Sequence, residues 1–243
     1  MERTKYLIVA FFFVLPWLAF CADEQQNIYN AYLKNDMATW KKMIDAMHAE
    51  SRKSNERELE LLNYEYGYIG WCMGNNKKSD AKIYILRGEE RLKKLSALNY
   101  KTSMLYAYKS AFYGFQIGLN KTKAPFLGGK SIDAANKAVE SDKNNPYGYI
   151  QLGNIEFYMP AIFGGSKKKA IEHYLKAQKL MESGAVKSDW NYLSLLTQIA
   201  KAYEELKDYK NAETYYRKIL SLAPDFAWVK NELYPALLNN KKR

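Results

Sequence analysis

Residues 193–225 read LSLLTQIAKAYEELKDYKNAETYYRKILSLAPD, and this stretch decides the fold of the 243-residue chain. In its first half, residues recur at the i, i+3, i+4, i+7 spacing of one helical face, at Leu196, Ile199, Ala200 and Tyr203. After Lys207-Asp208, the second half repeats this spacing at Ala212, Tyr216, Ile219 and Leu220. Pro224 follows, and proline cannot continue the hydrogen-bond ladder of a helix. The stretch therefore predicts two antiparallel helices, over residues 195–206 and 209–222.

Small and large residues alternate in a way that indicates close packing between these helices. Ala200 and Ala212 let two backbones approach, and Tyr203, Tyr209 and Tyr216 fill the space beside them. One such hairpin cannot bury its apolar face alone, so it needs stacked neighbours. We therefore expect an array of helical hairpins that presents a surface for binding.

The stretch resembles the tetratricopeptide repeat, a pattern of large, small, aromatic and proline positions within about 34 residues. The matching positions are Leu196, Ile199-Ala200, Tyr203, Ala212, Tyr216, Ile219 and Pro224. Leu196 replaces the commoner tryptophan and Ile219 the commoner alanine, and both remain apolar. The resemblance implies a superhelix in which the first helix of each hairpin lines a concave face that binds ligands.

A second unit precedes this one and is less regular. From Pro146 onward, the same positions fall on Tyr149, Leu152-Gly153, Ala170, Tyr174 and Ala177. The span from Gly153 to Ala170 is longer than in the family, and the added segment is MPAIFGGS at 159–166. A similar segment, APFLGGKS, occupies 124–131 in the preceding unit. Its recurrence indicates a feature of the repeat rather than an accident of composition.

Each of these two segments is interpreted as an enlarged turn between helices. Proline ends the first helix, glycine permits a positive φ, and the hydroxyl of Ser131 or Ser166 caps the second helix. We expect apolar side chains to cover the helix ends, namely Phe126, Leu127, Ile162 and Phe163. The alternative is an anion site at the glycine amides, although a phosphate-binding loop also requires a preceding strand.

Further helices are expected over residues 28–33, 37–48, 64–74, 80–98, 100–119 and 131–139, with a capping helix over 226–238. No stretch alternates apolar and polar residues long enough to predict a strand. The predicted fold class is all-α, an α-solenoid of four to five antiparallel hairpins plus the capping helix. A single domain then covers residues 22–240, and residues 241–243 form a basic tail.

The N-terminus has the pattern of a secretory signal peptide over residues 1–21. Arg3 and Lys5 precede an apolar run over 6–20, which is short for a membrane-spanning helix of about 20 residues. Cleavage is expected after Cys21, which places the protein in the periplasm or cell envelope. The alternatives are an uncleaved anchor helix and lipid attachment at Cys21, which would tether the chain to a membrane. With Cys21 gone, Cys72 has no disulfide partner.

The formal net charge of +11 does not by itself identify a partner. Nucleic acid is a common partner of basic proteins, but export argues against it. Outside the cytoplasm the available anions are lipid head groups, cell-wall polymers and acidic proteins. The lysines occur in short, scattered groups, which is typical of solvated loops and helix ends.

The residues that commonly perform catalysis are sparse. His48 and His173 are the only histidines, and neither has a nucleophile at a recognisable spacing. With one remaining cysteine, a structural zinc site is not expected either. We therefore predict a protein that is not an enzyme and holds no metal or cofactor.

The predicted function is that of a scaffold that binds a protein or peptide segment on its concave face. Carried over from the tetratricopeptide family, this face holds Tyr147, Ile150, Asn154 and Phe157 in one unit, and Ser194, Thr197, Lys201 and Glu204 in the next. An alternative for the aromatic residues is a role in packing only. The alternative function is a transport-accessory protein that holds a small ligand in an aromatic-lined cavity. The sequence indicates neither the identity of the partner nor an oligomeric state.

Overall fold

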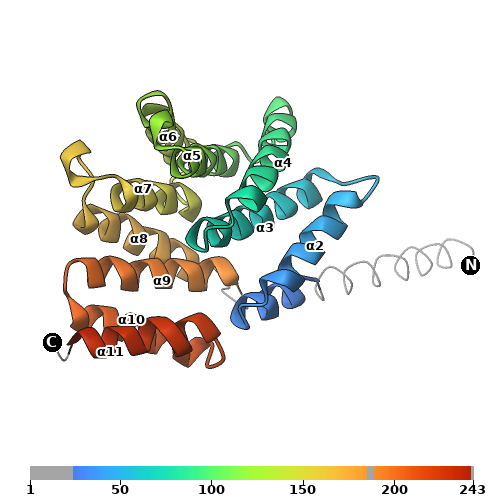
Figure 1. Cartoon of the computed structure of the whole chain (residues 1–243). Helices are drawn as coiled ribbons and strands as arrows, with labels where there is room; N and C mark the ends of the chain where they lie inside the picture. The colour runs from blue at the N-terminus through green and yellow to red at the C-terminus, as the bar shows by residue number, and fades with distance from the viewer. Residues whose placement is uncertain (1–23, 185–188, 242–243) are drawn as a thin grey trace, which may run out of the picture.

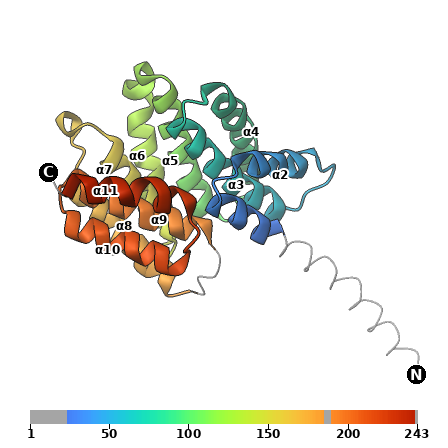
Figure 2. The same ribbon diagram turned by 60° about the horizontal axis from the view of Figure 1, so that its bottom comes forward.

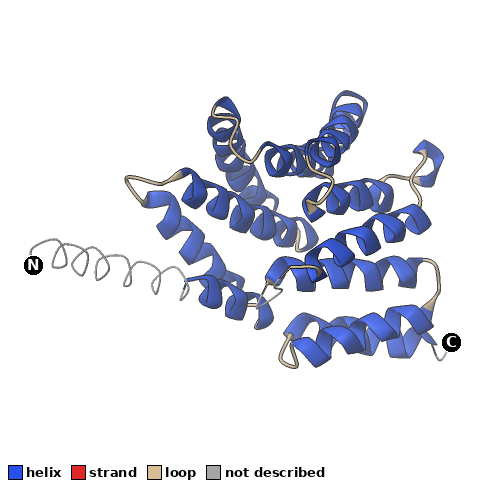
Figure 3. Cartoon of the chain, turned by 180° about the vertical axis from the view of Figure 1, so that it is seen from behind, coloured by secondary structure: helices blue, strands red, loops and turns tan. Residues whose placement is uncertain are grey.

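The computed structural model describes residues 24–184 and 189–241. The predicted signal peptide over residues 1–21, the lipidation site at Cys21 and the last two residues of the basic tail lie outside the described residues. Every regular element in the described ranges is a helix, and these ranges contain no strand (Figure 3). Within the same ranges, no helix combines the length and the apolar character that crossing a bilayer requires.

The helices follow one another as five antiparallel hairpins and a capping helix (Figure 1). The hairpins are residues 24–33 with α2 (Met37–Ala49), α3 (Asn55–Gly74) with α4 (Lys78–Ala97), α5 (Thr102–Leu119) with α6 (Ala124–Ser141), α7 (Pro146–Tyr158) with α8 (Lys167–Glu182), and α9 (Trp190–Glu205) with α10 (Tyr209–Leu222). Single 3₁₀ turns, η1 (Lys121–Lys123) and η2 (Ala161–Phe163), lie between α5 and α6 and between α7 and α8. The cap consists of a π-helical segment, η3 (Val229–Leu233), and α11 (Tyr234–Lys241). The predicted all-α solenoid of hairpins is confirmed.

The last hairpin forms as its sequence predicts. Lys207 takes a left-handed conformation with φ of 59°, which reverses the chain after α9. The Asp208 side chain then accepts a hydrogen bond from the Asn211 backbone N–H and caps α10. Ala200 and Ala212 are fully buried between the two helices. Small side chains therefore set the close contact between helices, as expected.

The expected turn at 124–131 is wrong, because these residues are the first two turns of α6. Pro125 lies in the first turn, where proline is well tolerated because its missing N–H would have no helical partner. Ser131 is consequently not a cap and lies inside the helix. Its hydroxyl donates to the Ser110 carbonyl (2.9 Å), and the Ser110 hydroxyl donates to the Ser131 carbonyl (2.8 Å).

The expected turn at 159–166 is confirmed. Gly164 has φ of 99°, a conformation that favours glycine. The Ser166 hydroxyl accepts from the Lys169 backbone N–H and caps α8. Three of the four apolar side chains do not cover the helix ends as expected, since Phe126, Ile162 and Phe163 are exposed. Leu127 is half-buried.

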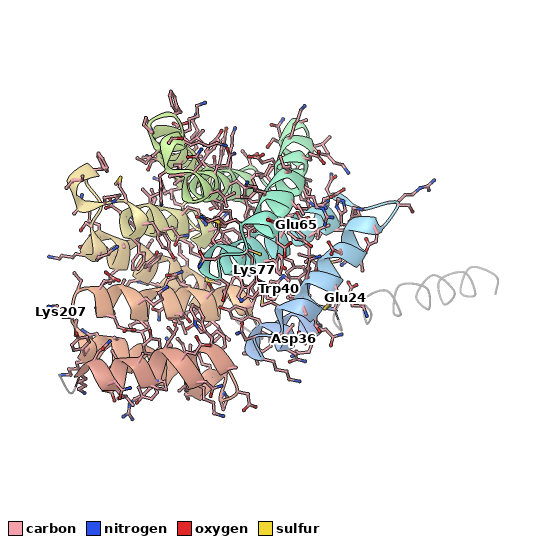
Figure 4. All side chains as sticks on the ribbon, viewed as in Figure 1. Glu24, Asp36, Trp40, Glu65, Lys77 and Lys207 are labelled. Carbon is pink, nitrogen blue, oxygen red and sulfur yellow. The ribbon has the colours of Figure 1, made fainter. Side chains whose placement is uncertain are left out.

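The array curls until its first hairpin meets its last (Figures 1 and 2). Tyr32, from the helix over 24–33, lies 5.8 Å from the Trp190 ring at the start of α9 and 4.9 Å from the Phe226 ring at the start of the cap. Trp40 of α2 meets Trp190 edge-on at 5.1 Å. The Trp40 side chain points from α2 toward the rest of the fold (Figure 4). Its indole N–H donates to the Tyr64 carbonyl at 3.1 Å. We call Tyr32, Trp40, Tyr64, Tyr66, Trp190 and Phe226 the aromatic cluster.

Candidate binding surfaces

The predicted concave site is largely buried. Ile150 and Phe157 belong to the hydrophobic core, with 8 % and 6 % of their surface exposed. The Tyr147 ring packs on Tyr108 at 6.0 Å, and burial raises the pKa of Tyr147. Within this set, Ile150 and Phe157 have little exposed surface, whereas Tyr147 is half-buried.

The polar residues of the predicted site are engaged within the chain. Asn154 accepts a hydrogen bond from the Tyr174 hydroxyl (2.8 Å) and donates to Gln151 (3.1 Å). Glu204 accepts from the Tyr216 hydroxyl, and burial raises the pKa of Glu204. The remaining members of the set are placed as follows: Lys201 Nζ lies 5.7 Å above the Trp228 ring, Thr197 is buried and donates to the Leu193 carbonyl, and Ser194 is half-buried. Binding by any of these residues stays a prediction.

The aromatic cluster explains why this face is filled. Tyr66 of α3 points at the first helices of the following hairpins, with its ring 5.6 Å from Tyr108 and 5.7 Å from Phe115. Its hydroxyl also accepts a hydrogen bond from Gln151 of α7 (3.4 Å). The packing interpretation of the aromatic residues is thus the one that the geometry supports. The aromatic side chains are covered by neighbouring helices of the curved array and not by the enlarged turns between helices.

A cleft of about 510 Å³ opens instead between α4 and the end of α5. It is lined by Lys82, Ile85, Leu86, Glu89, Gln116, Leu119, Asn120 and Lys123. The four α4 residues follow the i, i+3, i+4, i+7 spacing of one helical face. Leu86 is 63 % exposed, which is unusual for a large aliphatic residue at the wall of a cleft. The apolar lining of the cleft therefore consists of the exposed Leu86 and the half-buried Leu119, whereas Ile85 belongs to the core.

Charge is distributed unevenly around the cleft. Lys123 donates to the Gln116 side-chain carbonyl (3.0 Å), and the Gln116 amide donates in turn to Glu89. Burial raises the pKa of Glu89. Lys82, on α4 like Glu89, also lines the cleft and is exposed. The lysine amino groups can bind acidic groups of a ligand, whereas the Glu89 carboxylate is already hydrogen-bonded.

Sequence reasoning missed this cleft. The α4 spacing was visible, but an apolar stripe on a helix reads the same whether it is covered by a neighbour or left open. Leu86 and Ile83 of α4 are 63 % and 48 % exposed, and Leu86 lines the cleft between α4 and α5. The cleft has no signature in the local spacing of either helix.

Among the residues that the structure describes, the titratable side chains form no recognisable catalytic group. Burial and the nearby Arg87 and Arg91 lower the pKa of His48, and burial lowers the pKa of His173. Burial raises the pKa of the Cys72 thiol to about 11, so this thiol is a buried core group. In the described ranges, no three histidine, cysteine or carboxylate side chains are placed to hold a metal ion.

Comparison with known proteins agrees with the fold. The tetratricopeptide repeat model matches residues 193–226. A thermophilic tetratricopeptide-repeat protein of Thermus thermophilus superposes with a TM-score of 0.56 at 15 % identity, over 88 % of this chain and 99 % of that one. The HusA haemophore from Porphyromonas gingivalis superposes with a TM-score of 0.58 at 18 % identity, over 76 % of this chain and 93 % of that one. No curated protein sequence matches.

Proposed function

We propose that this tetratricopeptide-like chain is an exported, non-catalytic scaffold that binds an amphipathic segment of a partner protein in the α4–α5 cleft. The observation that carries the proposal is the exposed Leu86 side chain, which lines the cleft together with the half-buried Leu119. An apolar face of a helix or extended segment fits such a groove between two helices. Lys82 and Lys123 favour an occupant with acidic residues beside its apolar ones.

The helical scaffold supports this function because it is preformed. The walls of the cleft are long helices packed into the core by Tyr84 and Phe112, which are almost fully buried. A rigid site loses little conformational entropy when a ligand binds. The fold shared with tetratricopeptide-repeat proteins points in the same direction.

Selection of random displayed peptides on the purified protein tests the proposal. We expect enriched sequences to combine apolar residues at helical spacing with Asp or Glu. Leu86→Glu places a charge on the apolar lining and should abolish their binding, and Lys123→Glu should weaken it. Leu222→Glu is the matched control, because Leu222 is exposed on α10, away from the cleft. Peptides that bind the Leu86→Glu variant as well as the unchanged protein would contradict the proposal.

Export is tested separately by cell fractionation and by the intact mass of the purified mature chain. A mature chain that begins at residue 22 in the envelope fraction agrees with a cleaved signal peptide. An added diacylglycerol mass on a chain beginning at Cys21 agrees with the lipid-tethered form. A cytoplasmic chain that retains Met1 would contradict export.

A second candidate function is binding of a small amphipathic ligand in the same cleft. One structural neighbour is described as a haemophore, and the cleft volume lies within the range of small-molecule sites, about 300–1,000 Å³. Its apolar lining and flanking lysines suit a flat ligand with carboxylates. None of the lining residues is a histidine, methionine, cysteine or tyrosine, the side chains that ligate haem iron.

Haemin titration followed by absorbance and thermal unfolding tests this second candidate. Binding should raise the melting temperature and should be lost in Leu86→Glu. Because the cleft supplies no iron ligand, the Soret band should lack the shift that axial ligation causes. An unchanged melting temperature at saturating haemin would exclude this function.

A further inference from the structure

Two neighbouring hairpin tips carry the related segments that the sequence repeats. We call residues 119–130 and 158–169 the lysine tips, since each contains three lysines and no acidic residue. The lysines are Lys121, Lys123, Lys130, Lys167, Lys168 and Lys169. In the described part of the chain, none of the six forms an ion pair with a carboxylate.

Each lysine tip also exposes large apolar side chains. Phe126 is 74 % exposed, Ile162 85 % and Phe163 70 %. Ile162 and Phe163 belong to η2, which projects beyond the end of α7, and Phe126 lies in the first turn of α6. Neither the fold nor the α4–α5 cleft uses these three side chains. Exposed apolar residues grouped in this way generally mark an interaction surface.

The two lysine tips lie on the same edge of the molecule. Tyr108 of α5 packs beside Tyr147 of α7, and Leu119 and Tyr158 end these helices the same number of residues further on. The ends of α5 and α7 are therefore level. Figures 1, 2 and 3 agree, because both tips project next to each other from one side.

The neighbouring α9–α10 tip shows that this composition is not general for the array. Lys207 projects there (Figure 4), but Glu205 and Asp208 lie beside it in the sequence. Leu206 is its only exposed large apolar side chain. Taken together, the two lysine tips carry six lysines, no acidic residue and three protruding apolar side chains, Phe126, Ile162 and Phe163.

We propose that the lysine tips dock the protein onto an anionic lipid surface. Apolar side chains on a protruding tip can enter the boundary between head groups and acyl chains, while adjacent lysines attract anionic head groups. An acidic protein with a pocket for these side chains is the other occupant, and the vesicle measurements below distinguish the two. The first lysine tip shares Lys123 with the α4–α5 cleft, but the three protruding apolar side chains do not line that cleft.

Flotation of the purified protein with vesicles tests the proposal. We expect binding to vesicles of phosphatidylcholine mixed with phosphatidylglycerol, and little binding to phosphatidylcholine alone. Lys121→Gln/Lys168→Gln/Lys169→Gln should weaken binding about tenfold or more, because each lysine near an anionic surface contributes to affinity. The matched control is Lys42→Gln/Lys93→Gln/Lys143→Gln, which removes three exposed lysines from other parts of the surface and should bind almost as the unchanged protein does.

Apolar insertion requires its own variant, because lysines alone would bind any polyanion. Phe126→Ser/Ile162→Ser/Phe163→Ser should also lose vesicle binding, whereas Leu98→Ser/Leu222→Ser, at two exposed leucines elsewhere, should retain it. All five side chains are exposed, so the variants should keep wild-type helicity. The proposal would be overturned if Phe126→Ser/Ile162→Ser/Phe163→Ser still bound vesicles, or if the lysine control lost as much binding as the lysine-tip variant. Either result would indicate a general attraction to anions. Soluble polyglutamate would then compete with the vesicles for the protein.

Insertion is measured directly with a fluorescent reporter. The emission of Phe163→Trp, relative to the unchanged protein, should shift to shorter wavelength on adding anionic vesicles, because the indole leaves water. Leu222→Trp, on the exposed face of α10, should not shift. Identical behaviour of the two reporters would also overturn the proposal.

Discussion

Arg91 joins three helices of the N-terminal half through a buried charge network. Its guanidinium donates to Glu65 (2.9 Å) and to Glu58, both of α3, and contacts the His48 ring of α2. The Arg91 and Glu58 side chains are 6 % exposed, and that of Glu65 is completely buried. Figure 4 marks Glu65 within this part of the fold. Burial raises the pKa of Glu65, so the nearby guanidinium is needed to keep it charged.

Removing the Arg91 side chain should strongly lower the stability of the fold. Arg91→Ala leaves the buried Glu65 without its cation and removes one of the two cations that pair with Glu58. We expect the free energy of unfolding to fall by about 3–5 kcal/mol in urea denaturation. Lys94→Ala is the matched control. Lys94 pairs with the same Glu58 but is 52 % exposed, and such pairs contribute about 1 kcal/mol or less. Similar losses in both variants would show that burial of the network has no energetic importance.

Glu182 makes the stability of the C-terminal half depend on pH. Burial opposes its ionisation, but hydrogen bonds from Lys218, Tyr192 and Gln178 outweigh burial and lower the pKa of Glu182 to about 2. A glutamate in the unfolded chain has a pKa of about 4.3. The ionised form therefore stabilises the fold above about pH 4.3, and this contribution is lost as the pH falls toward 2.

Glu182→Gln should accordingly flatten the decline in stability between these two pH values. The measurement is the urea midpoint as a function of pH. Glu90→Gln, an exposed position on α4 without an ion pair, should keep the wild-type slope. A Glu182→Gln profile parallel to that of the unchanged protein would contradict the assignment.

At the scale of helices, glycine has different roles at different positions. A Cβ added to Gly153 of α7 would lie 2.4 Å from the Tyr174 ring of α8, whereas one added to Gly70 of α3 would meet no atom within 4 Å. The absence of a side chain at Gly153 therefore permits the close contact between α7 and α8. No close contact depends on Gly70. The repeat pattern predicts the first, because a small residue at this place is part of it.

Alanine substitution distinguishes the two glycines. Gly153→Ala should lower the free energy of unfolding by about 1–3 kcal/mol through overpacking. Gly70→Ala should raise it by up to about 1 kcal/mol, because alanine is the better helix former. Thermal unfolding of both variants checks the signs. Changes of the same sign would show that the α7–α8 contact has room for the added methyl group at residue 153.

The residue at which a helix begins was the feature hardest to predict from the sequence. APFLGGKS and MPAIFGGS are similar segments, yet the first is helix and the second is turn. Pro125 follows η1 directly and enters the first turn of α6, whereas Pro160 follows the end of α7 and leads into η2. A proline is compatible with the first turn of a helix and with the region after its end. Proline alone therefore does not distinguish the two structures.

At the scale of the whole molecule, the sequence predicted the stack of hairpins but not its closure. Contacts within and between adjacent hairpins follow from local spacing, and these were predicted from Ala200, Gly153 and their neighbours. The aromatic cluster instead joins Tyr32 to Phe226, which no local pattern relates. Local spacing also did not indicate that Ile150 and Phe157 of the predicted concave site are buried in the core, and binding at this face stays a prediction.

Closure also predicts cooperative unfolding. Stability in an open solenoid is close to a sum over neighbouring repeats, so its ends can unfold separately. Trp190→Ala removes the ring that contacts Tyr32, Trp40 and Tyr66. In hydrogen exchange, we expect α2 and α9 to show similar protection in the unchanged protein. In the variant, residues 24–33 and α2 should exchange faster than α10.

The matched control is Trp228→Ala, since Trp228 lies outside the aromatic cluster and contacts Lys201 of α9. This substitution should alter protection of the capping helix while residues 24–33 and α2 stay as in the unchanged protein. Faster exchange of the first hairpin already present in the unchanged protein would contradict coupling between the two ends.

The meeting of Tyr32 with Phe226 and Trp190 constrains how this chain changes length over evolution. Repeat proteins commonly gain or lose units by tandem duplication within the gene. Here an inserted hairpin would carry Phe226 away from Tyr32 and expose both rings to water, and a deletion would force the two ends into collision. We therefore expect related genes to vary at the hairpin tips, where Ile162 and Phe163 lie, while keeping the number of hairpins at five.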